Sequence, residues 1–96
     1  MNLLPGAQSV TSDLAVGNSG RIIRVFSVSL VSGGTLSNLI LRNGTTNSST
    51  PWVQITGVAN AGVTVNYEGG LQFPAGCFAD VDANITYATI SYTEEL

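Results

Sequence analysis

Glycine and asparagine recur every several residues along this chain and divide it into short runs rich in Val, Ile, Thr, Phe and Tyr. No stretch sustains the 3.6-residue spacing of apolar side chains that an amphipathic helix requires. β-branched and aromatic residues favour strands, whereas Gly and Asn favour the turns between strands. The sequence therefore predicts an all-β protein built from many short strands.

The turn signals divide the chain into about eight expected strands. Gly69 and Gly70 are expected to separate two of them, and the polar stretch 43–51 is expected to be the longest loop. The strands are expected within residues 7–16, 21–32, 36–42, 52–55, 63–67, 71–73, 77–81 and 85–93.

Two of these strands carry irregular patterns. In 21–32, Ile22, Phe26, Val28 and Leu30 are expected on one face, which places Arg24 among apolar residues. That arginine is expected either at an exposed strand end or opposite a carboxylate.

The last expected strand changes its apolar face part of the way along. Ile85 and Tyr87 lie on one side, and Ala88, Ile90 and Tyr92 lie on the other. A bulge or a bend is expected where the face changes.

Strands with one apolar face must bury that face against a second sheet. We therefore expect an antiparallel two-sheet β-sandwich, and the usual eight-stranded form is a jelly roll. A seven-stranded immunoglobulin-like sandwich is the alternative, but it lacks the paired cysteines that would flank Trp52.

The chain is long enough for one domain, since it has 96 residues. We divide it into residues 1–16, an N-terminal arm and possible first strand, and residues 17–96, the β-sandwich domain. Within the first part, Pro5-Gly6 suggests that residues 1–6 are an arm outside regular structure. Leu3 and Leu4 would then pack either on their own domain or on a neighbouring molecule.

Charged residues make up only 9% of the chain, against about a quarter in an average protein. The net charge is −3 with no lysine, which argues against nucleic acid as a partner because phosphate binding needs clustered cations. No apolar run is long enough to span a membrane, and the N-terminus does not resemble a signal peptide. A weakly charged β-protein is prone to association, so a partner or further copies are expected to cover its surface.

Catalytic chemistry finds little support. The chain has no histidine, the commonest general base and metal ligand, and no lysine. Cys77 is expected to be a buried structural thiol. Asp80, Asp82 and Asn84 have the spacing of the start of a calcium loop, but carboxylates before such a turn more often cap a hairpin. We expect no enzyme activity, no metal and no cofactor.

Several segments resemble the small β-sandwich virion proteins of tailed bacteriophages. They are Gly20-Arg21-Ile22-Ile23-Arg24-Val25, Leu39-Ile40-Leu41-Arg42-Asn43, the run from Glu68 to Ala79 with its Gly70-Leu71-Gln72-Phe73 core, and Ala88-Thr89-Ile90-Ser91-Tyr92. The resemblance covers about residues 20–93, and residues 1–16 match no pattern of that family.

The resemblance implies a jelly-roll-like virion protein, assembled in the host cytoplasm. The expected function is a head decoration or cement protein, a homotrimer bound to the major capsid protein through Leu3, Leu4 and Trp52. Trp52 is expected either to anchor such a contact or to cap the end of its own core. The alternative is a tail or neck module in which Trp52 and the loop 43–51 bind a host glycan or receptor.

Overall fold

The computed structural model describes residues 3–95, which form eight β-strands and contain no helix. The expected all-β class is confirmed. The strands are β1 (Leu3–Val10), β2 (Leu14–Val16), β3 (Ile23–Ser32), β4 (Ser37–Asn43), β5 (Thr50–Gly57), β6 (Gly62–Phe73), β7 (Cys77–Val81) and β8 (Ile85–Glu95).

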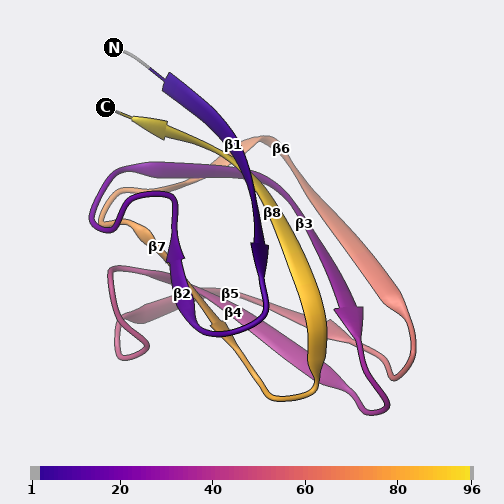
Figure 1. The fold of residues 1–96 in the computed structure, drawn as a ribbon. Helices are drawn as coiled ribbons and strands as arrows, with labels where there is room; N and C mark the ends of the chain where they lie inside the picture. Colours follow the sequence, from indigo (N-terminus) through magenta and orange to yellow (C-terminus); the bar gives the residue numbers. More distant parts are fainter. Residues whose placement is uncertain (1–2, 96) are drawn as a thin grey trace.

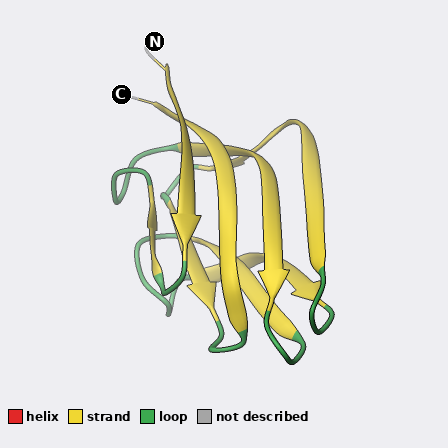
Figure 2. Cartoon of the chain, turned by 45° about the vertical axis from the view of Figure 1, so that its right-hand side comes forward, coloured by secondary structure: helices red, strands yellow, loops and turns green. Residues whose placement is uncertain are grey.

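The strands form two four-stranded antiparallel sheets that pack face to face (Figure 1). The first sheet has the order β1-β8-β3-β6, and the second has the order β2-β7-β4-β5. The pairs β1–β8, β2–β7, β3–β6 and β4–β5 are nested, as if one long hairpin had been rolled up. This is jelly-roll topology, so the expected sandwich class is confirmed. The four long strands of the first sheet stand side by side in Figure 2.

The core lies between the two sheets and is filled by alternate residues of the strands. Phe73 is its largest fully buried side chain. Burial of each large aliphatic side chain contributes about 1.5–3 kcal/mol to folding. The other buried apolar residues are Val10, Val16, Ile23, Val25, Val28, Leu30, Leu39, Leu41, Ile55, Cys77, Ala79, Ala88 and Ile90.

The prediction of which β3 residues share the buried face is partly wrong. Ile23 and Val25 are fully buried, whereas Phe26 is 37% exposed. The pairing of β3 with both of its neighbours shifts between Val25 and Ser27. Phe26 is the extra residue of a β-bulge, so the buried face changes there, and simple alternation cannot locate such a change.

Arg24 is the second residue of β3 and is half-buried, and it pairs with Gln72 and Thr93, neither of them a carboxylate. Its Nη1 donates a hydrogen bond to the Gly69 carbonyl at 3.3 Å. Gly69 and Gly70 do not end a strand, as the sequence suggested. They lie within a continuous β6, in a bulge of residues 67–70 opposite Phe26.

The irregularity expected in the last strand is confirmed. Val31 of β3 pairs with Tyr87, but the next residue, Ser32, pairs with Ile85. Thr86 is therefore the extra residue of a bulge. Ala88 and Ile90 then face the core and are fully buried.

The beginning of the chain also differs from expectation. Residues 3–6 belong to β1, which pairs along its whole length with β8, while residues 1 and 2 lie outside the described part. Pro5 is tolerated because β1 is an edge strand. The expected single strand 7–16 is two strands, because the chain turns at residues 11–13 and passes into the other sheet.

Candidate functional site

We call the end of the sandwich where β1 begins and β8 ends the terminal end. Here Leu4 pairs with Glu94, Glu94 with Ile23, and Ile23 with Phe73, so one row of residues crosses all four strands of the first sheet. The expected contact residues Leu3, Leu4 and Trp52 all lie at this end.

Leu3 and Leu4 begin β1 and are 52% and 48% exposed. Two residues later β1 is packed against β8, because the ring of Tyr92 lies against the backbone of its partner Gly6. A side chain at position 6 would collide with that ring. The two leucines are therefore presented to solvent on an ordered strand of the sandwich.

Trp52 lies near the start of β5, on the other edge of the terminal end. Leu41 pairs with Val53 and Arg42 with Pro51, so Trp52 is the extra residue of a bulge. Its ring centroid lies 5.4 Å from that of the buried Phe73, at an interplanar angle of 31°. Trp52 thus covers the end of the core, yet 45% of the residue is exposed.

The structure places the three predicted residues at one end but does not gather them into one cluster. Leu4 and Phe73 stand in the same row on opposite edge strands of the first sheet. Three strand spacings correspond to about 14 Å between those edges. Leu3 and Leu4 therefore mark one edge of the terminal end, and Trp52, which packs on Phe73, marks the other.

Between these edges, a buried carboxylate of β8 is hydrogen-bonded to the turn between β2 and β3. Glu94 is 3% exposed. It accepts hydrogen bonds from the Asn18 amide at 2.9 Å and from the Asn18 side chain at 2.7 Å. These two bonds lower the pKa of Glu94, burial opposes them, and the nearby Arg21 adds to the lowering. Glu94 is thus charged at neutral pH and ties β8 to the β2–β3 turn.

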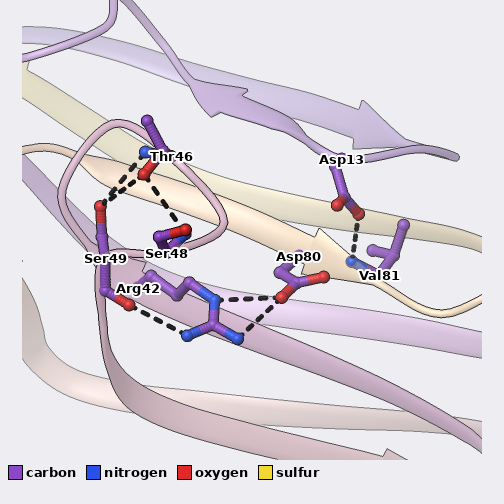
Figure 3. Close-up of polar contacts among 7 residues, drawn as sticks. All are labelled: Asp13, Arg42, Thr46, Ser48, Ser49, Asp80 and Val81. Atoms are coloured by element: carbon purple, nitrogen blue, oxygen red, sulfur yellow. Dashed lines mark hydrogen bonds and ion pairs between the residues drawn. The ribbon is translucent and has the colours of Figure 1, made fainter.

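Hydrogen bonds among its own residues hold the predicted polar loop between β4 and β5 (Figure 3). Arg42 donates to the Ser49 carbonyl at 2.9 Å and pairs with Asp80 of β7 at 2.9 Å. The Ser49 hydroxyl accepts from the Thr46 amide at 3.2 Å. The loop is therefore tied to the second sheet at its base.

The carboxylates considered for calcium have other partners. Asp80 accepts from Arg42, and Asp82 accepts from the backbone amides of Asn38 at 2.8 Å and Asn84 at 3.0 Å. Asp82 closes the β7–β8 turn through its bond from Asn84, but this turn passes from one sheet to the other and is not the hairpin that the sequence suggested. Within residues 3–95 no three acidic, histidine or cysteine side chains gather in a metal-binding arrangement.

Cys77 is buried at the start of β7, as expected. Burial raises the pKa of its thiol to about 12. A thiol with such a pKa stays protonated at neutral pH, whereas the thiolate is the reactive form. Cys77 is therefore a packing residue.

Exposed apolar side chains also occur at the opposite end, which we call the loop end. Leu36 in the β3–β4 turn is 51% exposed, and Val58 in the β5–β6 turn is 64% exposed. The two turns are joined by a hydrogen bond from the Asn60 amide to the Gly33 carbonyl at 2.7 Å. Sequence reasoning missed both residues, although an apolar residue within two positions of a glycine in a turn region is a usable signal.

No helix long and apolar enough to cross a membrane occurs among residues 3–95. Comparison with protein-family models, with curated proteins and with solved structures finds no match to this chain.

Proposed function

We propose that this chain is a structural protein of a tailed-phage virion, a decoration or cement protein that binds between neighbouring subunits of the major capsid protein. Two things support the proposal: the resemblance of residues 20–93 to such proteins, and the half-exposed Leu3, Leu4 and Trp52 at the terminal end. The second observation carries most weight because it supplies a contact surface.

Docking of this end would remove apolar surface from water, which is favourable by about 25 cal/mol per Å². Tryptophan is also enriched among residues that dominate interface energies. Trp52 is already immobilised on Phe73, so little side-chain freedom would be lost on binding. The terminal end is thus suited to attachment to another protein.

The proposal includes association into a trimer. Three copies would present three terminal ends to the capsid surface, and linked contacts raise avidity well above the affinity of one contact. Size-exclusion chromatography with light scattering tests this part, and a monomer at micromolar concentration would contradict it.

Substitution tests attachment more cleanly than deletion of residues 1–6, because residues 3–6 are part of β1 and pair with β8. We expect Leu3→Ser with Leu4→Ser to weaken binding to capsid particles at least tenfold while thermal unfolding stays cooperative. The matched control is Leu36→Ser with Val58→Ser at the loop end, which should bind normally. Equal binding by the two double variants would contradict the proposal.

The number of copies per particle tests the location. Quantitative mass spectrometry of purified virions should find this chain in amounts comparable to the major capsid protein. Absence from particles would refute the proposal.

A second candidate function is a tail or neck module that binds a host glycan or receptor. The exposed part of Trp52 favours it, since an aromatic ring held on a core residue can stack on a sugar. A handful of copies per virion, together with glycan-array binding lost in Trp52→Ala, would favour this candidate over the capsid proposal.

A further inference from the structure

The outward face of the first sheet carries two rows of short side chains, and all of them except Ala7 are polar. Val28, Leu30, Ala88 and Ile90 point into the core, so their strand neighbours point outward. The pairing aligns these neighbours across all four strands. One row is Thr64, Ser29, Thr89 and Ser9, and the next row is Asn66, Ser27, Ser91 and Ala7.

These rows form a regular array of hydrogen-bonding groups. Neighbouring strands stand about 4.8 Å apart, and alternate residues of one strand about 6.7 Å apart. The Ser29 and Thr64 hydroxyls lie 3.1 Å from each other, which shows that the array is closely spaced. Neither row contains a charged side chain.

An exposed aromatic residue stands at each end of the array. Tyr87 is 44% exposed, and it is the partner of Val31, the residue two beyond Ser29. Phe26 lies at the opposite side, where its ring edge and the Arg24 side chain cover Gly70. Five residues of strand separate the row of Tyr87 from Phe26, about 16 Å.

This combination restricts the chemistry of a ligand. A hydroxyl both donates and accepts hydrogen bonds, and it suits a ligand that does the same. A charged ligand lying on the two rows would lose hydration without gaining an ion pair there, since the neighbouring cation, Arg24 beside Phe26, lies outside the rows and donates to the Gly69 carbonyl. An apolar ligand would use none of the hydrogen-bonding capacity that remains in the rows beside the Ser29–Thr64 pair. Exposed rings offer flat apolar surfaces of the kind that pack on the C–H face of a sugar.

We propose that the outer face of the first sheet binds neutral polysaccharide, with Phe26 and Tyr87 stacking on sugar rings and the Ser/Thr rows hydrogen-bonding the hydroxyls between them. This site is separate from the terminal end, because Leu3, Leu4 and Trp52 belong to neither row. A particle-bound copy could therefore hold a surface glycan while the terminal end holds the capsid.

Affinity electrophoresis of the full chain in native gels tests the proposal. The gels contain hydroxyethylcellulose, galactomannan or dextran as neutral probes, and alginate as the anionic comparator. We expect retardation by at least one neutral polymer and none by alginate. Lack of retardation in all three neutral gels would overturn the proposal.

Variants then locate the site. Tyr87→Ala removes one ring, and Thr64→Lys places a long charged side chain in the array; each should weaken retardation at least tenfold. Gln54→Lys, an equal change of charge at an exposed residue of β5, is the matched control and should bind as the wild type does. Thermal unfolding establishes that each variant is folded.

Two outcomes would contradict the location. Undiminished retardation of folded Tyr87→Ala and Thr64→Lys would show that the polysaccharide does not bind to the array. Loss of binding in Trp52→Ala alone would move the glycan site to the terminal end. Attachment to capsid particles is measured separately, so failure of either proposal leaves the other testable.

Discussion

Glu94 is the residue whose environment has the clearest energetic consequence. Hydrogen bonds from the backbone and side chain of Asn18 lower its pKa below the ordinary value. Gly17, next to Asn18, has a positive φ of 64°, and a side chain there would strike the Glu94 carboxylate. The turn before β3 and the end of β8 are therefore built around one negative charge.

The lowered pKa of Glu94 makes the free energy of unfolding depend on pH in the acidic range. Because the folded-state pKa of Glu94 lies below that of the unfolded chain, its stabilisation is complete above about pH 4.3. It is lost as the pH falls through the folded-state pKa. Glu94→Gln keeps the shape but sets an amide donor against the Asn18 side chain, so it should lower the free energy of unfolding at pH 7 by about 1–2 kcal/mol.

Urea unfolding at several pH values measures this. The stability of Glu94→Gln should fall less between about pH 5 and pH 3 than that of the wild type. Glu68→Gln, at an exposed position, is the control and should follow the wild type. Parallel pH curves for the wild type and Glu94→Gln would contradict the assignment.

At the scale of elements, the bulge that β3 and β6 share depends on two glycines of β6. Gly69 and Gly70 have φ values of 79° and 84°, in the left-handed region that other residues occupy only with strain. Their surroundings differ. A Cβ at Gly70 would collide with Arg24 and press on Phe26, whereas a Cβ at Gly69 meets nothing within 4 Å.

This difference yields a matched pair of variants. Gly69→Ala should cost about 1–2 kcal/mol of stability from backbone strain alone. Gly70→Ala should lower the stability by at least about 1 kcal/mol more than Gly69→Ala does, because it must also displace the Arg24 side chain. Chemical denaturation measures both, and equal losses would show that Arg24 moves aside freely.

For the whole molecule, the nested pairing brings the two ends of the chain together. Leu3 pairs with Glu95, and both termini leave the same end of the sandwich (Figure 1). The first and last strands are therefore neighbours, and neither β1 nor β3 can form its full set of pairs until β8 is available to join them.

Adjacent termini predict that the chain tolerates circular permutation. A short Gly/Ser linker from residue 96 to residue 1, with new ends between Gly34 and Thr35, should give a protein with the same far-UV circular dichroism and a cooperative unfolding transition. New ends between Ile90 and Ser91 would divide β8 in the middle of the stretch that pairs with both β1 and β3, and should prevent folding. Cooperative folding of the second permutant would contradict the central role given to β8.

Much of this fold could be predicted from the sequence, because its determinants are local. Alternation and glycine spacing indicated an all-β sandwich of about eight strands, and 77–81 is the strand β7 as observed. The change of face between Tyr87 and Ala88 also disclosed the bulge at Thr86. Such features depend only on residue types a few positions apart.

Tertiary structure alone decided the features that depend on distant strands. Phe26 lies outside the core because β6 supplies four residues opposite it. Residues 3–6 are strand because β8 offers them a partner, which outweighs the local preference of Pro5-Gly6. Leu4 and Trp52 share the terminal end because three intervening pairings align them, and no local pattern encodes a register between strands so far apart in the chain.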